Sequence, residues 1–285
     1  MASIPLSSIS AVLLQQIEGL RYLVNVVHRT EECSADRAWL NSGQMLVIKV
    51  VHHMTAACDL AAGKQEDSGG EFEWFVDHSS IAVLVRAAFE ASVIFHFLFC
   101  DGTFEEKRLR YNVWRLAALS ARLQLRGTRN VQERVAPIRE RDKATVAELQ
   151  VSIQNDPLFQ ALSKDARNNA LRKGNFRLGY SWPELAEKAG VPRGYAADLY
   201  NHLCEYAHSG AVSTYQMRDA GSTGEGAGLA GGALLFCVLL LNELIVNYCK
   251  VFPKANEALL QNHKLLLDVA TWRQKRDTFA KEYSA

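Results

Sequence analysis

The chain has few prolines and no closely spaced cysteine pairs. Only six of its 285 residues are proline, which suits long uninterrupted helices. Its six cysteines are widely scattered, and most lie inside apolar runs: Cys33, Cys58, Cys100, Cys204, Cys237 and Cys249. This distribution favours reduced, buried thiols over a disulfide framework, so we expect a cytoplasmic protein.

The chain also lacks a strong net charge, a basic leader and a charge-free apolar run. Its formal net charge of +1 excludes a whole-protein field that would attract nucleic acid or membrane. The first five residues lack the positive region of a signal peptide. Two long apolar stretches, 81–99 and 229–252, each contain charged or amide side chains. A membrane span needs about 20 nearly uncharged residues, so we expect core helices and no membrane partner.

Helical spacing of apolar residues runs through the whole sequence, and apolar residues make up 48% of it. Thr103 with Glu106 has the spacing of a capping box, and Asp156-Pro157 is typical of a helix start. We expect loops over 63–70 and 211–228. The sequence therefore predicts an all-α bundle of nine to ten helices around two apolar central helices. It predicts one domain over 1–285 and leaves open a helical appendage at 128–179.

The segment from Tyr200 to Gly210 concentrates two histidines, two tyrosines, a glutamate and a cysteine. We expect a helix over 195–208, in which each residue turns by about 100°. Tyr200 then shares one helix face with four further side chains, those of Asn201, Cys204, Glu205 and His208. The side chains of His202 and Tyr206 lie on another face of this helix.

His208 is the main candidate for chemistry in this segment. It lies in the last helical turn, where the helix dipole stabilises a protonated imidazole. Asn201, Glu205 and Tyr200 are placed to orient it, so His208 could act as a general acid or base or hold a phosphate. The alternative is a histidine that caps its own helix and is hydrogen-bonded in the core.

Arg86 and Glu90 are four residues apart in the first apolar stretch, so they share a helix face. A buried charge is costly unless it is paired, which favours an ion pair that fixes helix packing. A second hypothesis is that Arg86 reaches the helix of His208 and supplies a cation there. A separation above about 10 Å would exclude this hypothesis, because side chains in contact approach within about 4.5 Å.

The pattern Tyr200-x-x-Leu203-Cys204-x-Tyr206-x-His208, with Arg86-x-x-x-Glu90, resembles a bacterial family of uncharacterised all-helical proteins. That family usually has serine in place of Cys204, and the resemblance spans roughly residues 75–210. The chain is more distantly similar to HEPN domains, helical bundles of toxins and antiphage systems. The ribonucleases among them carry an arginine shortly before a histidine that matches His208, whereas this chain has Asn201. The resemblance implies a homodimer that binds RNA or a nucleotide and, if an enzyme, a metal-independent ribonuclease.

The segment 105–143 is basic, with eleven Lys/Arg against five Asp/Glu. Five of its side chains form a stripe that could follow phosphates and stack on a base: Arg108, Tyr111, Arg115, Arg122 and Arg126. An ordinary solvated helix face is the other explanation. The partner that this stripe indicates is RNA.

Three further patterns are weaker. The glycine-rich run 221–228 lacks the lysine and preceding strand of a P-loop. Residues 184–191 resemble the start of a DNA-binding helix-turn-helix, but no basic second helix follows. The histidines and cysteines do not form a zinc pattern, so we expect no metal and no cofactor. The leading hypothesis is an RNA- or nucleotide-interacting protein of a bacterial defence or toxin system. The alternatives are a non-catalytic helical interaction module and a helix-turn-helix regulator.

Overall fold

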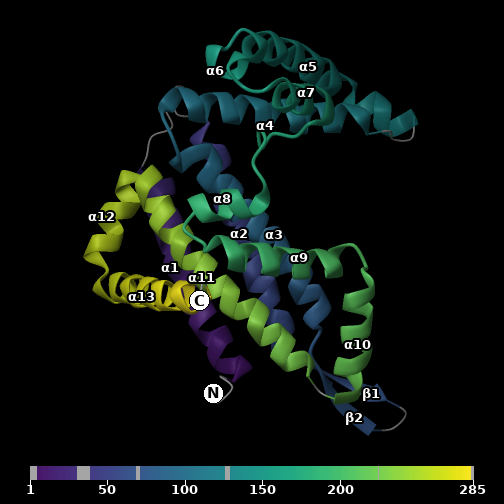
Figure 1. The fold of residues 1–285 in the computed structure, drawn as a ribbon, viewed down its shortest axis with the longest axis vertical. Helices are drawn as coiled ribbons and strands as arrows, with labels where there is room; N and C mark the ends of the chain where they lie inside the picture. Colours follow the sequence, from purple (N-terminus) through teal and green to yellow (C-terminus); the bar gives the residue numbers. More distant parts are fainter. Residues whose placement is uncertain (1–4, 31–38, 69–70, 126–128, 224, 284–285) are drawn as a thin grey trace. The chain divides into compact units, whose positions relative to one another are not determined.

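The computed structural model describes residues 5–30, 39–68, 71–125, 129–223 and 225–283. Within these residues the chain forms thirteen α-helices, a π-helical turn and one short β-hairpin (Figure 1). The predicted all-α class is confirmed, but the described helices outnumber the predicted nine to ten. Contacts divide the chain into two compact units, residues 1–100 with 182–285, and residues 101–181.

The first unit contains most of the helices and the hairpin. Its helices are α1 Leu6–Thr30, α2 Leu40–Ala61, α3 His78–Phe95, α8 Trp182–Lys188, α9 Arg193–Ala207, α10 Ala211–Thr223, α11 Gly226–Val251, α12 Pro253–Gln261 and α13 His263–Tyr283. The π-helical turn His96–Cys100 extends α3. Strands β1 Lys64–Ser68 and β2 Glu71–Phe75 pair antiparallel, with Lys64 opposite Phe75.

Helices α1, α2, α3 and α11 form the core of the first unit by packing against one another. In α1 the buried residues Leu13, Ile17 and Leu20 recur at helical spacing, which gives the helix one apolar face. Helices α3 and α11 are apolar on most sides, and Phe89 of α3 meets Phe236 of α11 with ring centroids 5.6 Å apart. Because α3 is held from several sides, it is a rigid support for the polar side chains that it carries.

Two described helical segments, His78–Cys100 and Gly226–Val251, have the length and apolar composition of membrane spans. Their most apolar windows are 67% and 72% buried within the fold, as in the core helices of soluble proteins. These helices therefore neither show nor exclude contact with a membrane. The absence of a membrane partner stays a prediction.

The second unit consists of α4 Phe104–Gln124, α5 Arg129–Gln154, α6 Pro157–Gln160 and α7 Lys164–Lys173. The capping box of α4 is confirmed, because the backbone N–H of Glu106 donates to Thr103 while the Glu106 side chain accepts from the Thr103 backbone. The apolar face of α4 packs on residues of α5, α6 and α7, including Ile153, Phe159 and Ala170. This packing explains why the second unit begins at residue 101 rather than at 128, where we expected an appendage to begin.

Two predicted loops are partly wrong. Residues 64–68 form the first strand of the hairpin rather than a loop, because their backbone pairs with residues 71–75. Residues 211–223 form helix α10, which begins directly after α9. Ser213 and Thr214 donate their hydroxyl protons to the carbonyl of Gly210, so the first turn of α10 is held by its own side chains. Residues 226–228 of the predicted loop are likewise helical, because α11 begins at Gly226.

Candidate functional site

Helix α9 carries the Tyr/His motif and packs across α3 (Figure 1). Its buried residues Ala196, Leu203 and Tyr206 face the core of the first unit. The ring of Tyr200 lies between Phe89 of α3 and Trp182 of α8, with centroid separations of 5.6 and 5.8 Å. These contacts fix the rotation of α9, and they direct the Tyr200 hydroxyl toward α3.

The end of α9 holds His208 in an unusual backbone setting. His208 is the C-cap residue, and the N–H of Gly210 donates to the carbonyl of Glu205 at 2.7 Å. This bond pattern is a Schellman motif, whose left-handed position is usually glycine. Here Ser209 occupies that position with φ of 54°. A non-glycine residue in this conformation stores strain of about 1–2 kcal/mol, and such strain clusters at functional sites.

Four predicted side chains meet where α9 crosses α3. Arg86 Nη1 lies 3.0 Å from His208 Nε2, and Arg86 Nε lies 3.0 Å from Glu90 Oε1. The Tyr200 hydroxyl donates to Glu90 Oε1 at 3.1 Å. Arg86 Nη2 lies 3.5 Å from the Tyr200 hydroxyl, at the limit of a hydrogen bond. The predicted proximity of Arg86 and His208 is confirmed, and we name these four residues the Arg86–His208 cluster.

The geometry sets the hydrogen-bonding roles of Arg86 and His208 in this contact. A guanidinium group has only donors, so Arg86 Nη1 donates and His208 Nε2 accepts. An imidazole that accepts at Nε2 carries its proton on Nδ1. Burial lowers the pKa of Arg86, but the Tyr200 hydrogen bond and the Glu90 carboxylate more than offset this and raise it. Arg86 is therefore a permanent cation beside a neutral imidazole.

Tyr200 has a perturbed acidity in the same cluster. Burial and the neighbouring Glu90 carboxylate raise the pKa of the Tyr200 phenol to about 12. A phenol with so high a pKa keeps its proton at neutral pH. Tyr200 therefore serves as a stable hydrogen-bond donor to Glu90 rather than as a proton source.

The structure places two other predicted site residues, Asn201 and Glu205, on α9. Asn201 is exposed on α9, and the described residues offer neither Asn201 nor Glu205 a hydrogen bond to His208. The Glu205 carboxylate instead fills the space that a Cβ of Gly210 would need. His208 is the C-cap residue and has left helical geometry. The orienting role of Asn201 and Glu205 therefore stays a prediction without a hydrogen bond to support it, whereas Tyr200 contacts Arg86 and Glu90.

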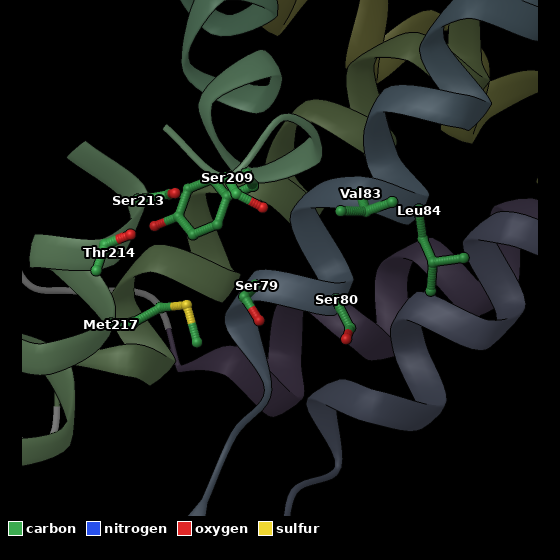
Figure 2. Close-up of a pocket in the computed structure, with 9 residues that line it drawn as sticks. Ser79, Ser80, Val83, Leu84, Ser209, Ser213, Thr214 and Met217 are labelled. Atoms are coloured by element: carbon green, nitrogen blue, oxygen red, sulfur yellow. The ribbon is translucent and has the colours of Figure 1, made fainter. Parts of the chain in front are cut away.

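An open cleft of about 520 Å³ adjoins the cluster. Figure 2 shows side chains of α10 facing side chains of α3 across it, with Ser209 at its edge. Its lining residues are Ser79, Ser80, Val83, Leu84, Tyr206, Ser209, Ser213, Thr214 and Met217. Val83 precedes Arg86 by one helical turn and Ser209 directly follows His208, so the lining includes sequence neighbours of the cluster, although none of the four cluster residues lines the cleft.

Sequence reasoning did not identify most of these lining residues. Ser213, Thr214 and Met217 were assigned to a loop, so no helix face was available on which to place them. Ser79 lies in the first turn of α3, whose N-cap is Asp77. Three hydroxyl residues within six positions, Ser209, Ser213 and Thr214, were the one available signal.

The basic stripe lies in the second unit and is partly used for structure. Arg122 donates to both carboxylate oxygens of Asp142, a residue only 4% exposed, at 2.7 and 2.5 Å. Arg115 lies over the ring of Tyr111 at 5.8 Å from its centroid. Arg108 is exposed, and the side chain of Arg126 lies outside the described residues. Contact with RNA along this stripe stays a prediction for Arg108 and Arg115.

The three weaker patterns gain no support from the geometry. Arg193, at the start of α9, pairs with Glu184 and Glu187 of α8, so its charge is neutralised where a recognition helix would need it. Asp198 and Asn201 are also exposed on α9 and add no positive charge. Among the described residues, no group of three or more His, Cys, Asp or Glu side chains is arranged to hold a metal.

Comparison with known proteins gives no relative: no family model, no curated protein and no solved structure matches this chain. The resemblance to the bacterial helical family and to HEPN domains therefore stays a prediction. The functional argument rests on the Arg86–His208 cluster and the cleft beside it.

Proposed function

We propose that the protein binds the phosphate group of an RNA chain or nucleotide at the Arg86–His208 cluster, with His208 as the acid–base group. One observation carries this proposal. Arg86 Nη1 lies 3.0 Å from His208 Nε2, and the His208 side chain is exposed to solvent. A cation and a neutral imidazole that solvent can reach are the two groups that metal-independent RNA cleavage needs.

A bound phosphate would change the partners of both groups. Its anionic oxygen is a stronger acceptor for Arg86 Nη1 than a neutral imidazole nitrogen. Transfer of this hydrogen bond would free His208 Nε2 to accept the proton of a ribose 2′-hydroxyl. The 2′-oxygen would then bond to phosphorus, and the 5′-oxygen would leave with its electron pair and take a proton from water. Arg86 would stabilise the charge on the phosphorane-like transition state.

The surroundings of the cluster support a preorganised site. Arg86 is held by Glu90 and Tyr200, and its side chain is only 17% exposed, so little conformational freedom is lost on binding. The strained Ser209 fixes the backbone next to His208. Arg86 also supplies from α3 the cation that the HEPN pattern would place near Asn201.

A second candidate function is a non-catalytic helical interaction module. The observation that favours it is that Arg86 already has three partners, Glu90, Tyr200 and His208, which join α3 to α9. In that case the cluster only locks two helices together. The two proposals differ in what removal of His208 does, because an exposed histidine contributes little to packing.

A bacterial defence or toxin role, a cytoplasmic location and a homodimer belong to the first proposal through the family resemblance alone. A dimer contact through the apolar helix α11 gains no support from the fold, because most residues of α11 are buried within it.

The test compares His208→Ala with His263→Ala, a matched change at another exposed histidine. We expect His208→Ala to lower cleavage of single-stranded RNA by about 10²–10⁴-fold, the usual contribution of a general acid–base group. Arg86→Lys keeps the positive charge but loses the planar guanidinium group with its paired N–H donors, so it should weaken binding of the phosphate. Melting temperatures measured alongside should stay within a few degrees of wild type for His208→Ala. An unchanged rate in His208→Ala, or RNA-inactive wild-type protein, would instead support the structural module.

A further inference from the structure

The cleft beside the cluster carries no charge on its lining. Its nine lining residues are serines, a threonine, a tyrosine and three apolar residues. Its volume of about 520 Å³ falls within the usual range for small-molecule sites, about 300–1,000 Å³. An uncharged lining cannot compensate the charge of a phosphate, so a phosphate would bind at Arg86 and not inside the cleft.

Most hydroxyl groups in the cleft already donate their proton within the protein. Ser213 and Thr214 donate to the carbonyl of Gly210 at 2.7 and 3.3 Å. Ser79 donates to Asp77 Oδ1 at 2.8 Å, and Tyr206 donates to Gln216 Oε1 at 2.9 Å. Each of these oxygens keeps lone pairs that can accept.

The cleft is therefore rich in acceptors and poor in donors. The Ser80 side chain also hydrogen-bonds to Asp77, so among the hydroxyl residues described in the lining only the Ser209 side chain has no hydrogen bond within the protein. A ligand that fits must bring donors of its own, because a carbonyl group facing these oxygens would lose its hydrogen bonds to water without replacement. Sugar hydroxyls and exocyclic amino groups are such donors.

Apolar side chains give the cleft a place for a flat ring. Val83 on α3 is 42% exposed and Met217 on α10 is 49% exposed, although both line the cleft. Figure 2 shows Met217 beside Ser79, with Val83 further along α3. Methionine makes favourable contacts with aromatic rings, and a base between these side chains would cover apolar surface that water now covers.

We propose that this cleft binds the nucleoside part of the ligand and selects an amino-bearing base, cytidine over uridine. This inference rests on the proposed function for its choice of a nucleoside over other neutral, donor-rich ligands. Cytosine carries an amino group with two donor hydrogens where uracil carries a carbonyl acceptor, and uracil carries one ring N–H donor where cytosine has an acceptor nitrogen. The two rings are alike in size, and cytosine brings one donor hydrogen more. The acceptor-lined cleft therefore stabilises the amino group of cytosine by a hydrogen bond, whereas the carbonyl group of uracil finds few donors there.

The experiment measures binding of cytidine, uridine and their 5′-monophosphates to the full chain by titration calorimetry at low salt. We expect each cytidine ligand to bind about threefold to tenfold more tightly than its uridine partner, the effect of one hydrogen bond. Thr214→Val should reduce this ratio toward one, because valine removes an acceptor and keeps the shape. The matched control is Thr271→Val on α13, since Thr271 donates to Leu267 in the same four-residue pattern and does not line the cleft.

The results separate this inference from the proposed function. Arg86→Ala should remove the advantage of the monophosphates over the nucleosides and leave the preference for cytidine in place. If the preference is present but Arg86→Ala does not affect the phosphate, the phosphate site is wrong and the cleft assignment stands. Equal binding of cytidine and uridine ligands, with a phosphate effect that depends on Arg86, overturns the cleft assignment alone. Absence of binding by all four ligands overturns both.

Discussion

Replacing Gly190 by alanine should strongly destabilise the first unit. Gly190 closes the turn between α8 and α9 with φ of 98°, where residues with a Cβ are strained. A Cβ there would lie 2.6 Å from Oε2 of Glu243 on α11. Glu243 is only 5% exposed, and its Oε1 accepts from Arg276 Nη1 at 2.6 Å. The methyl group would therefore press against a buried ion pair.

The magnitude follows from two contributions. The left-handed conformation costs a non-glycine residue about 1–2 kcal/mol. Loss of one partner from a buried ion pair costs about 3–5 kcal/mol, but here the Glu243 carboxylate is displaced and not removed. We therefore expect the free energy of unfolding to fall by about 2–4 kcal/mol, near the upper end of single substitutions. The melting temperature should fall by roughly 2–4 °C for each kcal/mol.

Thermal and urea unfolding followed by circular dichroism would measure this loss. The control is Gly232→Ala in α11, where a Cβ would meet no atom within 4 Å. Alanine has the better helix propensity, so Gly232→Ala should stabilise the protein by about 0.5–1 kcal/mol. If Gly190→Ala leaves the free energy of unfolding within about 0.5 kcal/mol of wild type, the size of a neutral surface change, the turn does not press on Glu243 as argued.

Two further predictions concern the same unit. Tyr200→Phe removes the hydroxyl that donates to Glu90 at 3.1 Å, so we expect a loss of about 1–2 kcal/mol in chemical denaturation. Tyr22→Phe, at a tyrosine 43% exposed, should be neutral, and equal effects of the two would contradict the account. Burial lowers the pKa of His202, so below about pH 6.5 the unfolded chain binds more protons than the folded chain. Stability should therefore fall as the pH is lowered from 7 toward 5. His202→Gln should make the free energy of unfolding depend less on pH over this range. An unchanged pH dependence would mean that groups other than His202 cause it.

Local signals in the sequence predicted helix ends well. Thr103 with Glu106, and Asp156 before Pro157, act as caps because the bonds they make lie within one helical turn. The same local reasoning missed α10, whose serines, threonines and glycines have low helix propensity. That helix starts directly after the Schellman turn at Gly210, whose carbonyl binds Ser213 and Thr214. Ser209 in a left-handed conformation gave no local signal for this turn.

The candidate site was predictable only in part. Charged residues in an apolar helix indicated that Arg86 and Glu90 had partners, and a polar helix end indicated His208. Their meeting across 122 positions depends on how α9 packs across α3, which no local pattern contains. Helical projection is least informative for Asn201 and Glu205, because His208 is the C-cap residue beyond the last regular turn. The cleft was not predicted, since three of its nine lining residues belong to the missed helix.

The most direct test of the central claim is the contribution of phosphate to binding in wild type and in Arg86→Ala. Titration of cytidine and cytidine 5′-monophosphate gives this contribution as the ratio of their dissociation constants. The account predicts that the monophosphate binds at least about tenfold more tightly to wild type, the effect of a charge-assisted hydrogen bond. It predicts a ratio near one for Arg86→Ala at an unchanged fold. An equal ratio in both proteins would contradict a phosphate site at the Arg86–His208 cluster.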